Sequence, residues 1–415
     1  MRIAVMGAGV VGVAAAYELL KDGHEVTVVD QAAEPASFAS FANAGLIAPG
    51  HAYAWASPRA PAMMLRSLYR NDQAIRFRPR MDPRLWRWTA RFLRECTAER
   101  ARINTERKAR LCLYSQARLQ KVVAETGAAY DANSGGLIYF YRSAKTFDLA
   151  ARKCEILRRQ GLRIEVLEGS EVAEKDPGLA PAVDRIAGAL FAPTDESGDA
   201  QMFTRALAER CMEMGAAFRM NTRVLGLETE AGRVGGLATD GGRIEADAYV
   251  LCLGVFSPHL VAGLGISLPI YPIKGYSVTM PVEAAHRPPR LGGVDEDYLL
   301  AYCPMGDRLR LTATAEFAGY DTGYRPSDFR IMLAKAREIF PEGADFETLS
   351  YWAGLRPMTP TGLPVIDRSP YENLWLNTGH GHMGWTMACG SARILADLIG
   401  QRKPEIDSDG MAYAA

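Results

Sequence analysis

The sequence lacks the residue patterns that mark several large classes of protein. Its seven cysteines are scattered, with no two closer than sixteen positions, so neither a CxxC metal site nor a disulfide framework is indicated. Its six histidines show no HExxH spacing, which removes a common zinc-peptidase motif. We therefore expect no metal site, and scattered thiols of this kind are typical of a reduced, cytoplasmic protein.

An excess of charge of one sign is also missing. Lys+Arg and Asp+Glu both number 48, which argues against a dedicated nucleic-acid binder. No uninterrupted apolar run reaches the ~18 residues of a membrane-spanning helix, and we find no internal repeat. What is present is a chain of 415 residues, 48% of them hydrophobic, which is long enough for two domains with real cores.

The N-terminal segment predicts the opening of a nucleotide-binding β-α-β unit. A strand over 2–6 is followed by Gly7-Ala8-Gly9-Val10-Val11-Gly12, an Ala-rich helix to Lys21 and a strand over 25–29. Such glycines let the backbone approach a pyrophosphate at a helix N-terminus. Asp30 follows, where a carboxylate binds ribose hydroxyls and disfavours the 2′-phosphate of NADP. The alternatives are a turn needed only for packing and a short signal peptide.

Three further segments favour FAD over NAD as the dinucleotide. They are the small-residue loop at 40–45, the apolar strand at 247–253 that ends at Gly254, and a second glycine-rich loop at 377–384 that opens a helix. A helix N-terminus aimed at a flavin stabilises negative charge on the reduced ring. Each segment can also be an ordinary connection. The cofactor contacts expected here are Ser40, Asn43, Ala44, Gly45, Val224, Gly254, Gly379, His380, Gly381, His382, Met383 and Gly384.

The remaining pattern predicts two interleaved domains. Helices are expected at 83–126, 147–160, 202–214, 327–339 and 385–399, and strands at 136–141, 217–220, 223–229, 233–239, 349–355 and 374–377. The nucleotide-binding signals are discontinuous along the chain. We therefore assign 1–84, 198–262 and 348–415 to an FAD-binding domain, and 85–197 with 263–347 to a substrate domain.

Taken together, the motifs resemble the FAD-dependent D-amino-acid oxidoreductase superfamily, and within it the bacterial D-amino acid dehydrogenases. The segments that carry the resemblance span almost the whole chain. They are 7–12, SFANAGLIAPG at 40–50, YPIKGY at 271–276, WAGLRPMTPTG at 352–362 and LWLNTGHGHMGWTMACG at 374–390.

The resemblance implies an α/β fold (α+β overall), with a glutathione-reductase-type, Rossmann-like FAD-binding domain and an interleaved antiparallel-sheet substrate domain. It also implies oxidative deamination of D-amino acids by hydride transfer to flavin N5, with electrons passed to a quinone or respiratory acceptor. Three alternatives stay open. They are a dehydrogenase for D-proline or 4-hydroxy-D-proline, a glycine- or sarcosine-type oxidase that uses oxygen, and an FAD-binding subunit without turnover.

The resemblance also assigns roles to individual residues. Arg356 matches the arginine that holds the substrate carboxylate, and a guanidinium suits that task. Without the resemblance, an arginine beside Pro357 would favour a surface or ion-pair role. Tyr276 is expected as a wall or hydrogen-bond donor, or else as a core aromatic. His51 and Tyr53, with Trp55, form either a lid over the substrate or a plain surface loop.

Some positions depart from the family pattern. His51, Thr361 and His382 stand where relatives show other residue types, which leaves the exact substrate open; His382 either lines the site or caps the last helix. The segment 352–356 contains no cysteine, so we expect non-covalent FAD, and Cys389 reads as a helix core residue.

One stretch of the chain is strongly basic. Between Arg59 and Arg110 there are fourteen Arg and one Lys against five acidic residues, with Trp86, Trp88 and Phe92 interleaved. One interpretation is an amphipathic helix with a solvated basic face. The other is a peripheral contact with anionic lipid on the inner face of the cell membrane, close to a quinone pool.

Overall fold

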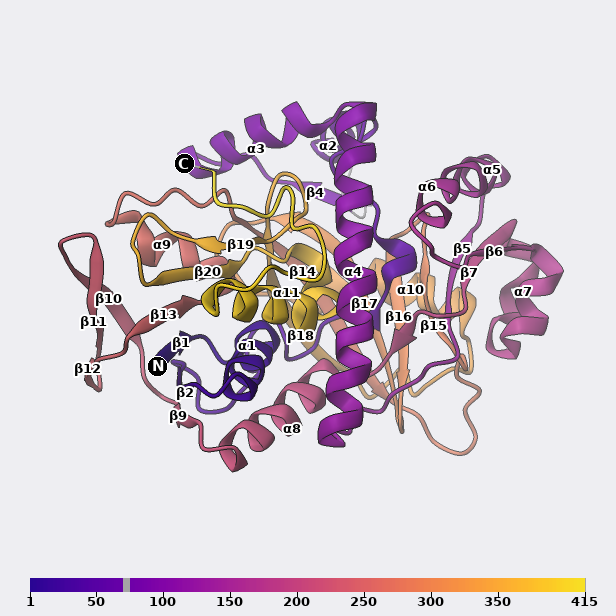
Figure 1. Cartoon of the computed structure of the whole chain (residues 1–415). Coiled ribbons are helices and arrows are strands. Elements are labelled where there is room, and N and C mark those ends of the chain that lie inside the picture. The colour runs from indigo at the N-terminus through magenta and orange to yellow at the C-terminus, as the bar shows by residue number, and fades with distance from the viewer. Residues whose placement is uncertain (70–74, 415) are drawn as a thin grey trace.

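The computed structural model describes residues 1–69 and 75–414 and shows two sheets side by side (Figure 1). The first is a six-stranded sheet in the order β19-β20-β13-β1-β2-β9. All its neighbours pair in parallel except β19 with β20. The strands are β1 (Arg2–Met6), β2 (Glu25–Val29), β9 (Ala217–Arg219), β13 (Ala248–Leu251), β19 (Val365–Arg368) and β20 (Leu374–Thr378).

Both faces of this parallel sheet are covered, which explains why its strands are apolar throughout. Alternate residues of β1 belong to different cores: Ile3 and Val5 pack under the helices, whereas Ala4 and Met6 pack toward the opposite layer. The helical layer contains α1 (Val10–Lys21), α4 (Ala98–Thr126), α8 (Ala200–Glu213) and α11 (Gly384–Ile399). The opposite layer contains β10 (Val224–Glu230), β11 (Arg233–Thr239), β12 (Gly242–Ile244) and α9 (Ser257–Ala262).

The second sheet has nine strands and is mostly antiparallel, with the order β18-β14-β17-β16-β15-β5-β7-β6 and β4 beside β17. Only the β5–β15 and β4–β17 pairs are parallel. The strands are β4 (Ile75–Phe77), β5 (Leu137–Tyr141), β6 (Glu165–Glu168), β7 (Gly188–Ala192), β14 (Tyr271–Pro281), β15 (Gly292–Asp295), β16 (Leu300–Met305), β17 (Arg308–Phe317) and β18 (Ser350–Met358).

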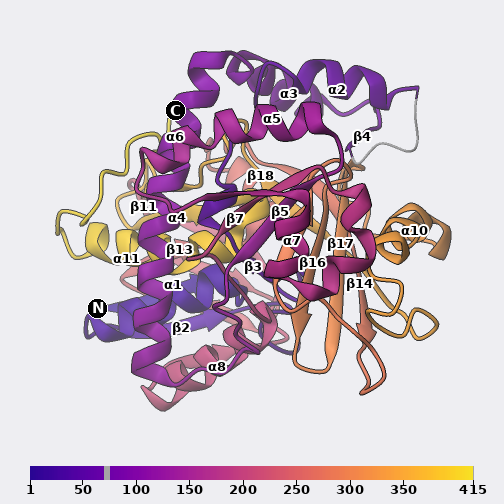
Figure 2. The ribbon, with the colours of Figure 1, turned by 90° about the vertical axis from the view of Figure 1, so that its right-hand side faces the viewer.

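The two faces of this sheet differ in character. One face is apolar and packs against α7 (Gly169–Lys175) and α10 (Arg330–Ile339), which flank β14, β16 and β17 in Figure 2. The alternating partners of those core residues, including Gly275, Ser277 and Thr279 on β14, are small or polar and lie toward the parallel sheet. A buried but polar face of this kind is suited to a polar ligand held between the sheets.

Shorter elements complete the chain. They are β3 (Leu46–Ile47), which pairs with β8 (Glu196–Ser197), the helices α2 (Ala60–Ser67), α3 (Pro83–Glu95), α5 (Ala144–Lys153) and α6 (Glu155–Arg158), and 3-10 turns at Pro49–His51, Pro177–Arg185, Gly254–Phe256, Pro326–Phe329 and Gly381–Met383.

The fold class expected from the sequence is confirmed, with local differences. The predicted helix over 83–126 is two helices, because Thr97 accepts a hydrogen bond from Arg100 N and starts α4 anew. The predicted helix at 147–160 is likewise divided into α5 and α6. The strand predicted at 349–355 was assigned to the FAD-binding segment. It is instead β18, paired along its length with β14 in the antiparallel sheet. The domain boundaries as a whole stay a prediction.

A buried carboxylate joins three helices that are distant in sequence. Glu18 of α1 is 1% exposed. It accepts hydrogen bonds from Arg118 of α4 at 2.7 Å and from Arg393 of α11 at 2.9 Å. Figure 1 shows α4 as a long helix that crosses the front of the molecule, so this ion pair fixes a helix from the predicted substrate segment onto the parallel-sheet unit.

Replacing Glu18 should therefore destabilise the whole molecule. We expect Glu18→Gln to lower the free energy of unfolding by about 3–5 kcal/mol, because two guanidinium groups lose their buried carboxylate. Glu34→Gln is the matched control, since the Glu34–Arg205 pair is exposed and should contribute less than about 1 kcal/mol. Urea unfolding followed by circular dichroism measures both, and equal midpoints for the two variants would contradict the assignment.

Candidate active site

The glycine loop after β1 is shaped for close backbone approach. Gly7 has φ +109°, and a Cβ there would lie 2.7 Å from the carbonyl oxygen of Cys252. At Gly12 a Cβ would lie 1.9 Å from the Gly7 oxygen. Gly9 is the N-cap of α1, and Ser40 Oγ accepts a hydrogen bond from Val10 N at 3.1 Å. The first turn of α1, with Val10 and Val11, thus presents N–H groups beside the Ser40 hydroxyl, which is the arrangement that binds a pyrophosphate.

Asp30 organises the neighbouring corner. Its carboxylate accepts hydrogen bonds from Ala8 N at 2.7 Å and Ala32 N at 2.8 Å, and burial raises its pKa. The backbone of Asp30 also accepts from Thr222 N, which brings the start of β10, at Val224, to the same corner. Each carboxylate oxygen keeps a lone pair for a ribose hydroxyl, so this corner fits the adenosine half of a dinucleotide.

The loop from Asn43 to Gly45 lies against the antiparallel sheet. Asn43 Oδ1 accepts from Gly45 N at 3.0 Å, with Ala44 between them. Gly45 has φ +71°, and a Cβ there would lie 2.1 Å from Met305 Cε. Any larger residue would push this loop away from β16, so the glycine fixes the loop where the two sheets meet.

The second glycine-rich loop joins the two sheets at the other side. Gly379 and Gly381 both have positive φ, and His380 forms an isolated bridge with Met358 at the end of β18. Thr378 Oγ1 donates to the Gly254 carbonyl at 3.4 Å, which draws the end of β13 into the same place. The loop runs through Met383 into Gly384, the first residue of α11, so this helix N-terminus lies next to β18.

The two histidines of this loop have different environments. His380 Nε2 is hydrogen-bonded to Ser391 Oγ at 2.9 Å, and burial lowers its pKa to about 3. Its ring therefore belongs to the core of α11, and only its backbone faces the loop. His382 does not cap the helix: its ring stacks on Trp55 at 4.6 Å between centroids, and its buried Nε2 has no partner among the described residues.

Arg356 is a cation enclosed by protein without an acidic partner. In residues 1–69 and 75–414, no carboxylate oxygen lies within 4.0 Å of its guanidinium, which donates only to the carbonyls of Thr314 at 3.0 Å and Lys274 at 3.5 Å. Burial lowers its pKa to about 10. The side chain nevertheless remains partly accessible, so it borders a space that an anion can enter.

The strands around Arg356 are adapted to its position. A Cβ at Gly275 would lie 2.4 Å from the guanidinium carbon, so the side chain lies flat across a glycine. A bulge in β17 opposite Gly275 gives Thr314 a φ of +65° and turns its carbonyl to the guanidinium. Trp352 covers Gly354 on the same face and meets Phe41 at 6.2 Å between ring centroids. These two rings form an aromatic wall beside the cation.

The structure corrects the role predicted for Tyr276. Successive strand residues point to opposite faces, and Gly275 faces Arg356, so Tyr276 faces the other way. It packs in the apolar core against Phe329, and its hydroxyl donates to Glu316. Of the two interpretations of Tyr276, the core aromatic is the correct one.

The segment with His51 and Tyr53 enters the interior and is not a plain surface loop. His51 Nε2 lies 2.7 Å from Glu296 Oε1, and its ring stacks on Tyr139. Burial alone would lower the His51 pKa, but the Glu296 carboxylate raises it overall. The Tyr53 hydroxyl is buried without a partner among the described residues. Trp55 then reaches the His382 ring, so the segment lies beside the second glycine loop.

Sequence reasoning missed Lys108, which it counted only within the basic stretch. Lys108 is 1% exposed, and its Nζ donates to the Tyr53 carbonyl at 2.5 Å. Burial lowers its pKa to about 8. Its helical spacing with Asn104, Ala109 and Cys112 could have indicated that Lys108 lies on the buried face of α4.

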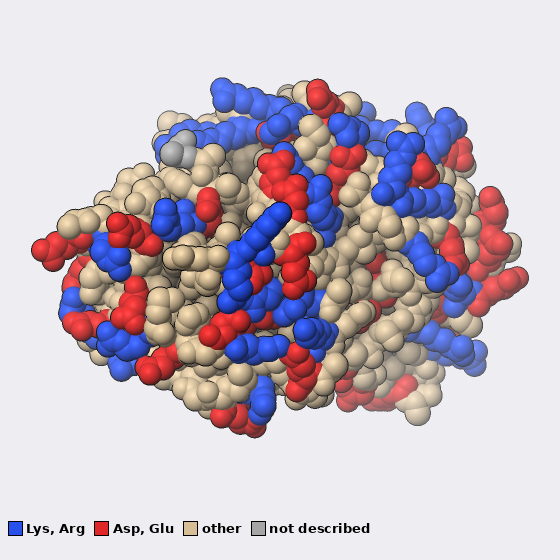
Figure 3. All heavy atoms as spheres, viewed as in Figure 1, with Lys and Arg blue, Asp and Glu red and all other residues tan. Residues whose placement is uncertain are grey.

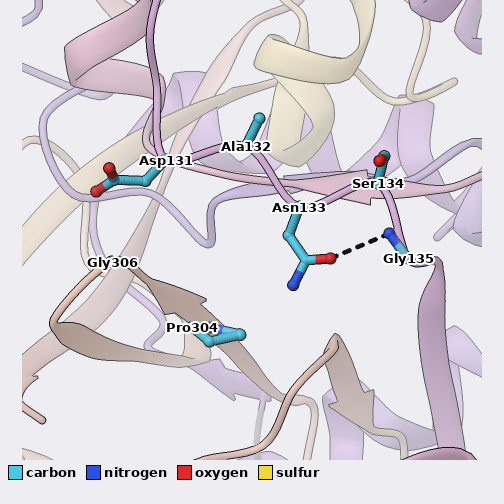
Figure 4. A pocket seen from close by; sticks show the side chains of 7 residues that line it. All are labelled: Asp131, Ala132, Asn133, Ser134, Gly135, Pro304 and Gly306. Carbon is cyan, nitrogen blue, oxygen red and sulfur yellow. Dashed lines mark hydrogen bonds between the residues drawn. The ribbon is translucent and has the colours of Figure 1, made fainter.

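A surface depression is lined by other residues (Figure 4). It is open, and its lining residues are Asp131, Ala132, Asn133, Ser134, Gly135, Pro304 and Gly306. Asn133 Oδ1 accepts from Gly135 N across it. None of the expected site residues lines it, so we assign it no part in the chemistry.

The residues between the sheets therefore fit a flavin dinucleotide. The phosphate loop, Asp30 and Val224 form one end, and the helix N-terminus at 381–384 forms the other. No group of His, Cys, Asp or Glu in the described part of the chain is arranged to hold a metal ion.

Comparisons with known proteins agree with this geometry. A family model described as FAD dependent oxidoreductase (DAO) matches residues 2–398. D-amino acid dehydrogenase 2 of Mesorhizobium japonicum is 47% identical over 414 residues, covering 100% of both chains. D-amino acid dehydrogenase of Paramagnetospirillum magneticum is 46% identical over 412 residues, covering 99% of this chain and 98% of the relative.

Solved structures show the same fold at lower identity. Glycine oxidase from Geobacillus kaustophilus superposes with a TM-score of 0.76 at 23% identity, over 100% of this chain and 98% of that one. L-proline dehydrogenase from P. horikoshii has a TM-score of 0.75 at 20% identity, over 99% and 96%.

The space at Gly275 gives a direct test of the Arg356 site. A methyl group there meets the far end of a flexible side chain, so we expect Gly275→Ala to fold and keep its flavin but displace the guanidinium. Affinity for a small carboxylate, followed by the flavin absorbance, should fall about ten- to a hundred-fold, the loss expected for a charge-assisted hydrogen bond. Gly226→Ala is the matched control, because its Cβ meets nothing within 4 Å. Unchanged carboxylate affinity in Gly275→Ala would show that the anion binds elsewhere.

Proposed function

Because this chain belongs to the FAD dependent oxidoreductase family, we propose that it is a D-amino acid dehydrogenase. It oxidises the C–N bond of a D-amino acid, and the imino acid then hydrolyses to a 2-oxo acid and ammonia. The observation that carries the proposal is the enclosed Arg356 guanidinium, which has no acidic partner among the described residues. Two relatives with that name match this chain along its whole length.

The chain's own residues supply binding and orientation. When bound, FAD would supply the hydride-acceptor chemistry, and the electronic demands of the reaction would belong to it. Arg356 would hold the substrate carboxylate with two parallel hydrogen bonds, and the wall of Trp352 and Phe41 would limit the substrate's movement and exclude water. The N-terminus of α11 supplies a positive dipole beside the same space. Holding the reacting atoms in line accounts for most of the rate in a reaction of this kind.

No protein base is needed if the substrate reacts as the neutral amine. His382 is neutral near pH 7, because burial and then the nearby charges of Lys108, His51 and Arg356 lower its pKa. His380 is neutral for the same reason of burial. The site therefore keeps its positive charge on Arg356 and Lys108. Non-covalent attachment of FAD stays a prediction.

The electron acceptor is proposed to be a membrane quinone, reached through the surface formed by α2, β4 and α3. No helix in the described ranges has both the length and the apolar composition to cross a bilayer, so any contact would be peripheral. Large apolar side chains are exposed on this surface: Leu65 is 63% exposed, Tyr69 88%, Met81 102% and Trp86 49%. Trp88 and Phe92, which the sequence grouped with them, are buried in the core beneath α3.

Basic side chains surround these apolar groups. Figure 3 shows Lys and Arg gathered along the upper edge, where Figure 1 places α3. On α3 the exposed basic residues are Arg84, Arg87, Arg91 and Arg94. Exposed apolar groups within a basic surface are typical of proteins that lie on anionic lipid. This feature favours a quinone over oxygen as the acceptor.

The substrate proposal is tested by removing the guanidinium. Arg356→Ala should lower the efficiency of anaerobic flavin reduction by a D-amino acid about a hundred- to several-thousand-fold, because the carboxylate loses its buried partner. Arg356→Lys should recover only part, since an ammonium cannot make the two-pronged contact. Arg330→Ala, which removes an exposed arginine, is the control. An Arg356→Ala holoenzyme reduced at parental efficiency would disprove the role, and reduction by L- but not D-amino acids would disprove the substrate class.

The membrane proposal is tested by reversing charge on α3. Binding to vesicles of anionic lipid at low salt should weaken about thirty-fold or more in Arg87→Glu/Arg91→Glu, because each basic residue near such a surface contributes about 1 kcal/mol. Arg210→Glu changes an exposed arginine on α8 and should have no such effect. Co-sedimentation measures both, and equal binding of the parent to neutral and anionic vesicles would refute the contact.

A further inference from the structure

Lys108 is a second enclosed cation that the reaction described above leaves without a task. It projects from the buried face of α4, 1% exposed, and uses one of three donors on the Tyr53 carbonyl. No carboxylate oxygen of residues 1–69 or 75–414 lies within 4.0 Å of its Nζ. Burying an ammonium without a nearby anion costs free energy, so we expect Lys108 to bind an anionic ligand.

The same space holds the unpartnered His382 side chain. The ring of His382 is stacked on Trp55, two residues from Tyr53, and its Nε2 is buried with no partner among the described residues. Lys108, His51 and Arg356 are all close enough to lower the pKa of His382. His382 thus lies within electrostatic range of both enclosed cations, and a neutral imidazole can donate one hydrogen bond from Nε2.

The charges around this space do not balance. His51 is paired with Glu296 at 2.7 Å, so that pair adds no net charge. Arg356 and Lys108 remain, each without a carboxylate among the described residues. The α-carboxylate of an amino acid would neutralise only one of them, and its amine must be neutral to react. The buried Asp195 carboxyl, which bears on His51, is already hydrogen-bonded by Tyr139 and Gly50 N, and burial raises its pKa to about 7. The substrate considered so far therefore offers Lys108 no anionic partner.

We propose that Lys108 and His382 bind a second carboxylate on the substrate side chain, so that this enzyme prefers dicarboxylic D-amino acids such as D-aspartate and D-glutamate. Arg356 then holds the α-carboxylate, and Lys108, with His382 Nε2 beside it, holds the distal one. The inference rests on the proposed function for the reaction itself, but the binding of two anionic groups does not depend on turnover.

The test compares acid and amide substrates, which differ only in that charge. The parent should reduce its flavin at least tenfold more efficiently with D-aspartate than with D-asparagine, or with D-glutamate than with D-glutamine. Lys108→Met, which keeps the volume of the side chain, should lower this acid-to-amide ratio about ten- to a hundred-fold. Lys335→Met removes an equal charge from α10, on the opposite face of the sheet, and should keep the ratio. A parent without acid preference, or a Lys108→Met ratio equal to the parental one, would overturn the proposal.

A pH profile of the parent gives a second readout that needs no folded variant. Burial lowers the pKa of Lys108 to about 8, and kcat/KM reports the free enzyme. The acid-to-amide ratio should therefore decline as the pH rises through about 8, where Lys108 loses its charge. Lys108→Arg should keep the ratio above pH 8, because a guanidinium stays charged. A flat ratio from pH 6 to 10 in the parent contradicts the assignment.

Two further outcomes distinguish this proposal from a role of Lys108 at the flavin and from a failure of the proposed function. If Lys108→Met lowers the efficiency of acids and amides equally and shifts the flavin reduction potential, Lys108 acts on the flavin and the proposal is wrong. If no D-amino acid reduces the flavin, the proposed function fails. Calorimetric binding of succinate against succinamate to parent and Lys108→Met holoenzymes then decides the dicarboxylate site by itself, and equal affinities would exclude it.

Discussion

A guanidinium held inside the protein without an anion is the constraint on which the site depends. Removing such a charge from water costs several kcal/mol, and two backbone carbonyls offset only part of that cost for Arg356. The surrounding features follow from it. Gly275 leaves the space, the bulge at Thr314 turns a carbonyl inward against its backbone preference, and Trp352 and Phe41 stand beside the cation. A carboxylate that binds here supplies the ion-pair partner that the folded protein itself does not give Arg356.

The sequence was informative where the chain forms structure from neighbouring residues. The run from Gly7 to Gly12, between two strands and ahead of Asp30, predicts its own geometry, because tight turns and helix starts are local. Arg356 became a candidate only through resemblance, since its environment is built by Gly275 and Thr314 from other strands. Tyr276 was misplaced because the face it occupies depends on the β14–β18 register, which no local pattern states.

The interpretation of Lys108 from the sequence was wrong for a different reason. Counting charge along the chain placed it among surface bases, although the periodicity of α4 puts it on the buried face. Positions 51, 108 and 382 are far apart in sequence. Helix α4, the His51 segment and the second glycine loop bring them together. If these residues bind the substrate side chain as proposed, its selection can change here while Arg356 and the phosphate loop stay as they are.

The strand order of the parallel sheet also determines when the protein can become complete during synthesis. β1 and β2 are synthesised long before β13, with which β1 pairs on its other side, and β19 and β20 are synthesised later still. At about 5–20 residues per second, β1 waits roughly 10–50 s for β13. The helix that closes the flavin-side loop arrives last of all. Complete closure of the cofactor site must therefore wait for α11, and the unpaired edge of β1 is the part that a chaperone would have to protect in the meantime.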